Sequence, residues 1–225
     1  MHSDMMLTPS VVSSHLLQGL SGDECRSVLT EARQLKFIRN SVAVNQGHPG
    51  DRLFLLAEGR ARFFFVTADG TKILLRWIIP GQIFGASALL TTQSSYLVGT
   101  EMVRDSIVLV WDRPTIKKLA ERYSRLLENV LVISEDYLSW YIAAHEALTT
   151  HNARERLAHL LSRLAESIGQ KGAGGIELDV TNEELASAAN VTTFTVSRLL
   201  SQWQRRGAIA KSRNRLVICS PKQIL

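Results

Sequence analysis

The pattern of apolar and polar positions divides the chain into three parts, of which the first looks like β structure. From about Lys36 to Trp111, short runs rich in branched and aromatic residues, such as L-F-L-L and A-R-F-F-F-V, alternate with turn sequences. The turn sequences are Q-G-H-P-G-D, E-G-R, A-D-G-T and P-G-Q-I-F-G. Short strands that recur between glycine turns predict a sandwich or barrel. A short helix is predicted before this part, with Ser21 as its N-cap.

The second part, from about Arg113 to Thr149, predicts one long amphipathic helix. It contains no glycine, and its proline, Pro114, falls at the start, where a helix tolerates proline. Apolar residues recur at steps of three, four and seven and form a seam of Leu126, Val130, Ile133, Tyr137, Trp140, Ala144 and Leu148. Such a seam packs either on its own β domain or on the same helix of a second subunit. A helix this long between two domains favours the second arrangement, so the seam is the predicted dimer interface.

The third part predicts helices, a strand and a hairpin. A-R-E-R-L-A-H-L-L-S-R-L-A is amphipathic, S-I-G-Q-K-G-A-G-G predicts a loop and I-E-L-D-V a strand. Thr181 and Glu184 have the spacing of a capping box, which marks a helix start before a tight turn at N-V. The next helix ends at Gly207, and I-A-K-S-R-N-R-L-V-I predicts a basic hairpin. This order of elements is typical of a winged helix-turn-helix.

The second helix of that motif, which contains T-T-F-T-V-S-R-L-L from residue 192, has two unlike faces. At about 100° per residue, an apolar stripe lies on one side. The stripe consists of Val196, Leu199, Leu200 and Trp203. Ser197, Arg198, Ser201 and Arg205 lie on the other side, and Phe194 is near the centre of this polar face. The position of a large aromatic side chain there requires an explanation.

Charge is distributed unevenly along the chain. Residues 1–150 hold 15 Lys/Arg and 15 Asp/Glu, whereas residues 151–225 hold 11 Lys/Arg and 6 Asp/Glu. From Thr192 to Leu225 there are seven basic residues and no acidic one. A basic surface confined to the helix-turn-helix predicts a polyanionic partner, with a solvated basic face as the alternative.

Together these features predict binding to double-stranded DNA. The second helix would lie in the major groove, where Arg198 pairs with guanine and Ser197 and the threonines reach bases or phosphates. Basic residues on the hairpin and at the helix end would meet phosphates. The predicted contact residues are Thr192, Thr193, Phe194, Thr195, Ser197, Arg198, Arg205, Lys211, Arg213 and Arg215.

Composition excludes several other classes of protein. We find no phosphate-binding glycine loop, no metal-ligand constellation and no Ser/His/Asp set, so an enzyme is not expected. Cys25 and Cys219 are far apart in the sequence and predict free thiols rather than a metal site. No apolar run is long enough for a membrane span, and the first residues do not resemble a signal peptide, so the expected location is the cytoplasm.

The chain resembles the CRP/FNR family of bacterial transcription regulators over nearly its whole length. The residues that carry the resemblance are L-F-L-L-A-E-G-R, D-G-T-K, P-G-Q-I-F-G, the long helix, A-R-E-R-L-A-H-L-L and V-S-R-L-L. The resemblance implies an α+β fold: a cyclic-nucleotide-binding-like β-roll sensor over residues 1–124, a dimerisation helix and hinge over 125–150, and a winged helix-turn-helix over 151–225. It also implies a homodimer on palindromic DNA, with 167–175 near RNA polymerase if the protein activates transcription.

The recognition helix departs from the family pattern at one position. Members of the fumarate–nitrate type read DNA with Glu-x-x-Ser-Arg; Ser197 and Arg198 match, but Phe194 replaces the glutamate. A carboxylate accepts from cytosine N4, whereas a phenyl ring contacts a thymine methyl. The half-site is therefore expected to differ there. The alternative is that Phe194 folds onto a neighbour and reads nothing.

The resemblance implies an effector pocket whose residues do not suit cyclic AMP. Cyclic-nucleotide binders carry a glutamate after F-G and an arginine further along, but Gly85 is followed by Ala86 and Ser87, and Tyr96 stands near the arginine position. Tyr141 stands on the long helix where small hydroxyl residues face the base. Burying a phosphate without a cation is costly. Cyclic AMP is therefore not expected.

Other effectors are left open by these residues. The cysteines of the family's iron–sulfur sensors are missing, so no cluster is expected. Haem is left as an alternative, because His48, His145, His151 and His159 could act as ligands. The favoured interpretation is that these histidines are solvated or hydrogen-bonded. No cofactor is predicted, and the effector is a small molecule, a protein or nothing. The alternative to a DNA-binding regulator is a regulatory module that acts through protein partners.

Overall fold

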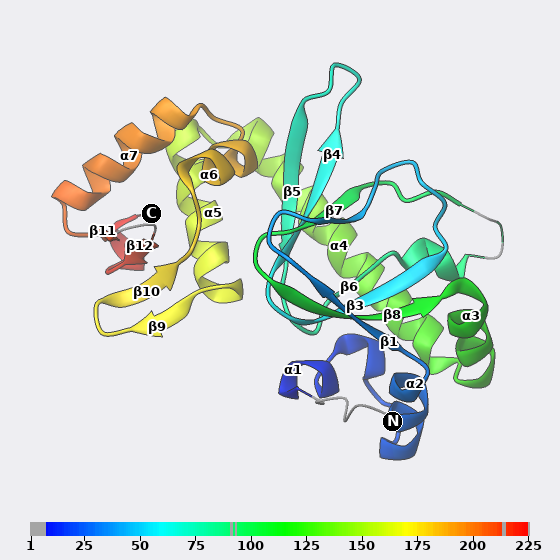
Figure 1. Ribbon diagram of the computed structural model, residues 1–225. Helices are drawn as coiled ribbons and strands as arrows, with labels where there is room; N and C mark the ends of the chain where they lie inside the picture. Colours follow the sequence, from blue (N-terminus) through cyan, green and yellow to red (C-terminus); the bar gives the residue numbers. More distant parts are fainter. Residues whose placement is uncertain (1–7, 91, 93, 213–214, 225) are drawn as a thin grey trace. The chain divides into compact units, whose positions relative to one another are not determined.

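The computed structural model describes residues 8–90, 92, 94–212 and 215–224 (Figure 1). The chain forms two compact units, Met1–Leu138 and Ser139–Leu225. The division falls within a single helix, α4 (Arg125–Thr150). The domain limits expected at 124/125 and 150/151 stay predictions, and each unit is described by itself below.

The first unit contains two four-stranded antiparallel sheets, with strand orders β1-β8-β3-β6 and β2-β7-β4-β5. The strands are β1 (Arg33–Phe37), β2 (Val42–Val44), β3 (Arg52–Glu58), β4 (Ala61–Val66), β5 (Lys72–Ile78), β6 (Ile83–Phe84), β7 (Gly99–Met102) and β8 (Ser106–Asp112). The helices, besides the first part of α4, are α1 (Pro9–Val12), η1 (His15–Leu17), α2 (Gly22–Thr30), η2 (Ala86–Leu89) and α3 (Arg113–Arg122). The predicted β domain is confirmed.

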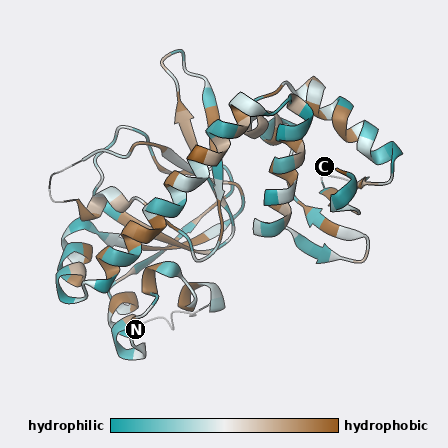
Figure 2. Ribbon diagram, turned by 180° about the vertical axis from the view of Figure 1, so that it is seen from behind, coloured by the Kyte–Doolittle hydropathy of each residue, from teal (hydrophilic) through white to brown (hydrophobic). Residues whose placement is uncertain are grey.

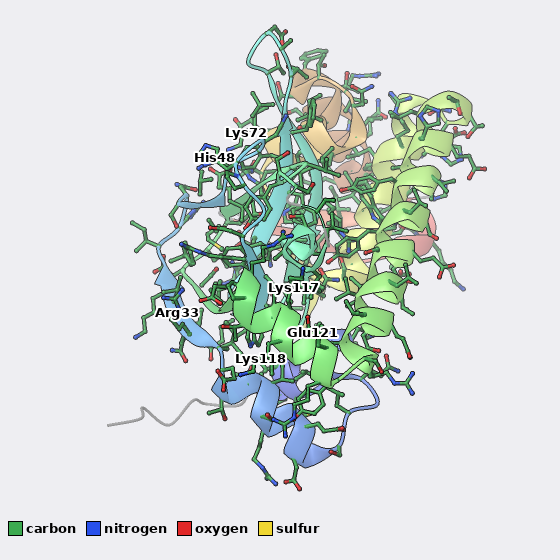
Figure 3. The ribbon with its side chains drawn as sticks, turned by 90° about the vertical axis from the view of Figure 1, so that its right-hand side faces the viewer. Arg33, His48, Lys72, Lys117, Lys118 and Glu121 are labelled. Atoms are coloured by element: carbon green, nitrogen blue, oxygen red, sulfur yellow. The ribbon has the colours of Figure 1, made fainter. Side chains whose placement is uncertain are left out.

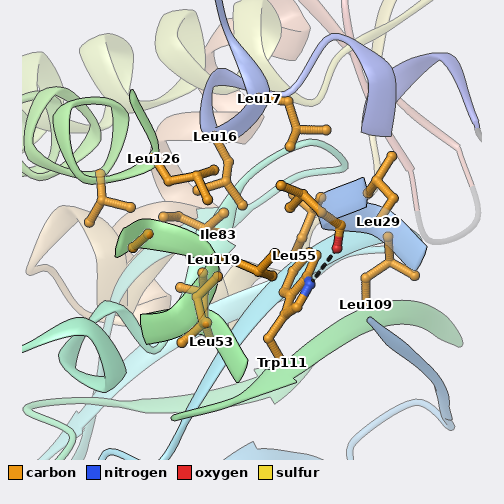
Figure 4. Packing of buried hydrophobic residues seen from close by; sticks show 14 of the residues in the cluster. Leu16, Leu17, Leu29, Leu53, Leu55, Ile83, Leu109, Trp111, Leu119 and Leu126 are labelled. Carbon is orange, nitrogen blue, oxygen red and sulfur yellow. Dashed lines mark hydrogen bonds between the residues drawn. The ribbon is translucent and has the colours of Figure 1, made fainter. Parts of the chain in front are cut away.

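Strand β3 shows why the predicted strands are apolar at nearly every position. Phe54 and Leu56 pack in the core between the two sheets. Leu53 points to the opposite face and packs with Trp111 and the helices (Figure 4). The indole N–H of Trp111 donates a hydrogen bond to the carbonyl oxygen of Val28 in α2, at 2.8 Å. Because successive side chains of a strand point to opposite faces, a strand covered on both sides is apolar throughout.

Two local signals in this unit are confirmed. Ser21 is the N-cap of α2: its Oγ accepts from the Glu24 N–H at 3.3 Å, and a Glu24 carboxylate oxygen accepts from the Ser21 N–H at 2.8 Å. The turn E-G-R depends on Gly59, whose φ is +92° and whose Cβ, if present, would lie 2.5 Å from the carbonyl oxygen of Asp105. The capping box follows from local chemistry alone, whereas Gly59 is required both by its positive φ and by the close approach of the distant Asp105 backbone.

The single helix expected over residues 113–149 is two helices, so that prediction is wrong. Helix α3 ends at Arg122, and Tyr123 has φ −124° and ψ 81°, which is not helical. The break lets Leu119 of α3 and Leu126 of α4 enter the same core (Figure 4). The ring of Tyr123 packs against that core as well. Tertiary packing therefore overrides the continuous helical periodicity here.

The outer side of α3 is charged. Lys118 and Glu121 are exposed and Lys117 is half-buried, as the side chains in Figure 3 show. Ile116 and Leu119 on the inner side are buried. Helix α3 therefore covers the sheet with one face and meets solvent with the other.

The first half of the predicted dimer seam lies in the core of its own unit. Leu126, Val130 and Ile133 are at most 9% exposed and belong to the core cluster of the sheet β1-β8-β3-β6. Tyr137 donates a hydrogen bond from its hydroxyl to the carbonyl oxygen of Ile83 at 2.8 Å. The prediction that Leu126, Val130 and Ile133 meet a second subunit is wrong, because these side chains are already covered.

A second apolar stripe runs along α4, shifted by one residue, and it is exposed. We call it the exposed α4 stripe, and it consists of Leu127, Leu131, Leu138 and Ile142, which are 47%, 72%, 60% and 61% exposed. Apolar positions recur along the whole of α4 in Figure 2. From Leu127 to Leu138, with Ser134 included, the stripe has the steps of four, three and four residues of a coiled-coil seam, and Ile142 lies four residues further on.

The second unit contains the rest of α4 and a small α/β domain. Its elements are α5 (Ala153–Ser167), β9 (Gln170–Gly172), β10 (Gly175–Leu178), α6 (Asn182–Ala189), α7 (Thr193–Arg205), β11 (Ile209–Ser212), β12 (Arg215–Ile218) and η3 (Pro221–Gln223). The sheet order is β11-β12-β10-β9. The loop expected at S-I-G-Q-K-G-A-G-G is partly wrong, since 170–172 pair with β10 as a strand.

Three members of the predicted seam lie on the part of α4 that belongs to this unit. Trp140 and Ala144 are half-buried, and Leu148 is exposed. The guanidinium of Arg163 in α5 lies 5.1 Å from the centroid of the Trp140 ring. Trp140 therefore packs on α5 of its own chain.

Candidate nucleic-acid interface

Helices α6 and α7 form the predicted helix-turn-helix. Thr181 and Glu184 make the expected capping box at the start of α6, with bonds of 3.1 and 2.9 Å. Asn190 ends α6 in the left-handed conformation, with φ 50° and ψ 56°. Asparagine tolerates this conformation better than most residues, so the chain reverses here without glycine.

The start and the buried face of α7 follow directly from its sequence. Thr192 is the N-cap: its Oγ1 accepts from the Thr195 N–H at 3.1 Å and lies 2.9 Å from the Thr195 hydroxyl. Gly207 follows the helix with φ +73°. The expected apolar stripe is buried, at 4% exposure or less: Val196, Leu199, Leu200 and Trp203. Helix α7 is therefore held firmly by α6 and α5 and presents its other face outward.

Arg156, on α5, fixes the turn between α6 and α7. Its Nε donates to the carbonyl oxygen of Ala189 at 2.9 Å, and an Nη donates to that of Asn190 at 3.2 Å. The other Nη donates to the carbonyl oxygen of His151, just after α4, at 2.8 Å. One guanidinium thus joins the end of α4 to the turn before α7. We did not predict this role, because the partners are backbone carbonyls that carry no sequence signal.

The outward face of α7 carries the predicted contact residues. Thr193, Ser197, Arg198 and Arg205 are exposed, and Phe194 is 75% exposed. The alternative that Phe194 folds onto a neighbour is therefore wrong. The hydroxyls of Thr192 and Thr195 are engaged in the cap, which limits them to contacts that keep that geometry.

The hairpin β11–β12, which follows α7 in the sequence, carries further basic residues. Lys211 is exposed, and Arg213 lies outside the described residues. The guanidinium of Arg215 forms an ion pair with Glu177 of β10 at 2.7 Å. Arg215 is therefore partly neutralised, which the sequence did not reveal.

Replacing Glu177 with glutamine is expected to strengthen binding to DNA of any sequence. The change releases the Arg215 guanidinium for a phosphate, so affinity should rise a few-fold at low salt. The plot of log K against log[salt] should steepen by up to about 0.9. Fluorescence anisotropy over a series of salt concentrations measures both quantities. Glu166→Gln makes the same change in net charge at an exposed site on α5; an equal effect there would contradict the role of the ion pair.

Four of the predicted effector residues, Gly85, Ala86, Ser87 and Tyr96, belong to the first unit. Gly85, with φ +80°, leads into η2, which carries Ala86 and Ser87. The hydroxyl of Tyr96 accepts from the Arg52 N–H at 3.0 Å and lies 3.1 Å from the Arg52 carbonyl oxygen. Burial raises the pKa of the Tyr96 phenol, so it stays protonated and able to donate.

The remaining pocket residue, Tyr141, lies in the other unit. There it packs edge-on against Trp140 with ring centroids 5.1 Å apart. Residues 85–87 and Tyr96 thus belong to the first unit, whereas Tyr141 is described only with the second.

The histidines and cysteines do not gather into a metal site in the part of the chain that the structure describes. His151 and His159 stack on each other with ring centroids 4.6 Å apart. Cys25 and Cys219 are free thiols, as predicted. Among the described residues, no helix is both long and apolar enough to cross a membrane.

Comparison with known proteins matches a different family model to each of the two units. The model of the cyclic nucleotide-binding domain matches residues 34–123, and that of the Crp-like helix-turn-helix domain matches residues 155–224. The chain is 27% identical to the transcriptional regulator LdrP of Thermus thermophilus over 190 residues, which cover 81% of this chain and 90% of LdrP. It is 26% identical to the cyclic AMP receptor protein of the same species, with 87% and 88% covered.

Solved structures show the same fold. FixK2 from Bradyrhizobium japonicum superposes with a TM-score of 0.75 at 19% identity, over 86% of this chain and 95% of FixK2. A CRP-family transcriptional regulator from Thermus thermophilus superposes with a TM-score of 0.71 at 26% identity, over 84% and 94%. The β domain, the long helix, the helix-turn-helix and these matches agree in order and extent, and the chain belongs to the CRP/FNR family of DNA-binding transcription regulators.

Proposed function

We propose that two copies of the chain pair along the exposed α4 stripe and place their α7 helices on the two half-sites of a palindromic DNA. The observation that carries this proposal is the outward face of α7, which is exposed, free of acidic residues and held from behind by four buried side chains. Two recognition helices related by a two-fold axis require half-sites about one turn of DNA apart, roughly 34 Å.

The exposed α4 stripe supports the pairing. Leu127, Leu131 and Leu138 keep about half or more of their surface in solvent, although each gains roughly 1.5–3 kcal/mol when fully buried. Ser134 lies within the stripe, where a small polar residue allows close approach of two helices. A parallel pair of α4 helices covers these leucines with their own copies.

Arg198 is the residue proposed to read a base. It is exposed on the first turns of α7, where a guanidinium reaches O6 and N7 of guanine with two hydrogen bonds. Ser197 beside it is proposed to reach a base or a phosphate, and Arg205 and Lys211, which are exposed, are proposed to contact phosphates. Base reading thus falls to the start of α7 and general affinity to its end and the hairpin.

Cyclic AMP is not the proposed effector, and the chain is proposed to act by binding rather than catalysis. The buried core that includes both sheets is apolar and contains two ring contacts: Phe54 and Phe84 stack with centroids 4.6 Å apart, and Phe63 meets Tyr137 at 5.9 Å. Ala86 and Ser87 offer no charge to a ribose or phosphate. Calorimetric titration with cyclic AMP at millimolar concentration tests this proposal about the effector. Binding of cyclic AMP in the β domain would contradict it.

The hairpin β9–β10 is the surface proposed to touch RNA polymerase if the protein activates transcription. Gln170, Lys171 and Gly172 at its edge are exposed. Transcription in vitro from a promoter with the selected site shows whether the protein raises or lowers the amount of transcript. If it raises the amount, Lys171→Ala should reduce that activation without changing binding to the DNA.

Selection of DNA from a random pool by the purified protein, without added ligand, tests the proposal. The expected result is a palindromic motif whose half-sites are centred one helical turn apart. Absence of any enriched sequence at moderate salt, with and without cell extract, would favour the alternative of a module that acts through protein partners.

Replacing Arg198 with alanine is expected to remove the preference at one base pair of each half-site. Loss of a bidentate pair corresponds to about 5–150-fold in discrimination between the preferred and other bases. Binding to unrelated DNA should change only modestly, and Arg198→Lys, which keeps the charge but lacks the planar guanidinium, should lose part of the discrimination. The measurement is a repeat of the selection with each variant. An equal loss of affinity on all sequences would show a phosphate contact instead.

A further inference from the structure

Phe194 is an exception among the apolar residues of the DNA-binding part of the chain. It is the second residue of α7 and is 75% exposed. From α5 to the end of the described chain, no other large hydrophobic side chain is exposed. Folding has placed one phenyl ring in solvent while it buried Val196, Leu199, Leu200 and Trp203 of the same helix.

The exposed ring contributes little to the packing of α7. The helix starts from the Thr192 cap and is held by its opposite face. A phenylalanine is also a weaker helix former than alanine or glutamate, so helix propensity does not explain it. The fold of the described chain therefore does not account for the ring, and its place on the outward face of α7 leaves it available for contact with a partner.

The neighbours of Phe194 define that partner. Arg198 lies one turn further along the same face, and Thr193 and Ser197 beside it are exposed and polar. This face is the one proposed to enter the major groove. A phenyl ring has neither donor nor acceptor, and the C5-methyl group of thymine is the apolar feature that base edges present there.

We propose that Phe194 reads a thymine methyl group in each half-site, an inference that rests on the DNA binding proposed above. Phe194 and Arg198 are four residues apart on the helix, about 6 Å along the axis. Base pairs stack about 3.4 Å apart, so the thymine lies within about two base pairs of the guanine that Arg198 reads. The half-site therefore contains a guanine and a thymine in close succession, on either strand.

The test removes single methyl groups from the DNA. The motif is first selected from a random pool, and each thymine in it is then replaced by deoxyuridine, one symmetric pair at a time. Deoxyuridine keeps every hydrogen-bonding group of thymine and lacks the methyl. Loss of one buried methyl weakens binding about fourfold in each half-site, or about 15-fold for the symmetric pair. One position should show this loss for the wild-type chain, and the same substitution should leave Phe194→Ala unchanged.

Matched variants separate the methyl contact from other effects. Phe194→Leu, which keeps an apolar side chain, should retain part of the sensitivity to deoxyuridine, and Thr193→Ala should retain all of it. Phe194→Glu should change the selected base to cytosine, whose N4 amino group donates to a carboxylate. Where cytosine is placed at the thymine position, 5-methylation of that cytosine should strengthen wild-type binding about fourfold. Because Phe194 is exposed, these variants should keep the wild-type circular dichroism spectrum and melting temperature.

Two outcomes would overturn the inference. One is a palindromic motif in which no thymine methyl affects wild-type binding. The other is a sensitivity to deoxyuridine that Phe194→Ala retains. In either case the enriched motif would still support DNA binding, whereas a failure to enrich any DNA would reject the proposed function itself.

Discussion

Replacing Leu131 with glutamate is expected to convert the proposed dimer to a monomer and to weaken binding to the palindromic site by about 10²–10⁴-fold. Leu131 is 72% exposed in the centre of the exposed α4 stripe, so two copies would meet at this position. Two carboxylates brought together in an apolar seam lose hydration and repel each other. A monomer binds one half-site only. It therefore loses the increase in affinity that comes from binding two linked half-sites at once.

Sedimentation equilibrium and DNA titration measure the two effects. Val132→Glu is the matched control, because Val132 is 53% exposed on the same helix but lies about 100° around it from Leu131. It introduces the same charge and should leave both the mass and the affinity close to those of the wild type. A Leu131→Glu chain that stays dimeric, or a Val132→Glu chain that becomes monomeric, would show that the interface lies elsewhere.

Replacing Trp203 with alanine is expected to lower the free energy of unfolding of the second unit by about 3–5 kcal/mol. Trp203 lies on the inner face of α7 and is fully buried, and the Arg154 guanidinium lies 5.6 Å from its ring centroid. The free energy of unfolding of a natural domain is only about 5–15 kcal/mol. The substitution would therefore remove a large part of the stability that holds α7 in place. DNA binding should fall with it, although no base contact has been removed.

Urea unfolding followed by circular dichroism gives the change in free energy. Gln204→Ala, at the exposed neighbouring position, should differ little from the wild type. Trp203→Phe should cost much less than alanine, because it keeps a ring and removes an indole N–H that has no hydrogen-bond partner among the described residues. A Trp203→Ala chain within about 1 kcal/mol of the wild type would mean that α7 does not depend on this contact.

The elements defined by local chemistry could be predicted from the residues alone. Ser21 with Glu24 and Thr181 with Glu184 satisfy backbone groups within one turn, so their helix starts do not depend on the rest of the fold. The buried face of α7 follows from its periodicity in the same way. The family resemblance added the order of the domains and their DNA-binding function.

The role of each side chain on α4 could not be predicted in this way. The helix is apolar at 126, 130 and 133 and again at 127, 131 and 138, so periodicity shows two stripes and does not distinguish them. The core below the sheet β1-β8-β3-β6 covers the first stripe and leaves the second in solvent. The prediction that Leu126, Val130 and Ile133 face a second subunit is wrong for this reason.

Long-range contacts decided the other differences. Tyr123 breaks the expected helix because its ring and the leucines on either side share one core. Glu177 neutralises Arg215 across two strands that are far apart in sequence, and Arg156 reaches carbonyls more than thirty residues away. The exposure of Phe194 belongs to the same class, since its sequence placed it on the polar face but only the packed domain shows that nothing described covers it. Caps and periodicities depend on neighbours along the chain, whereas burial depends on which distant segments arrive beside a residue, and these are fixed only when the whole chain has folded.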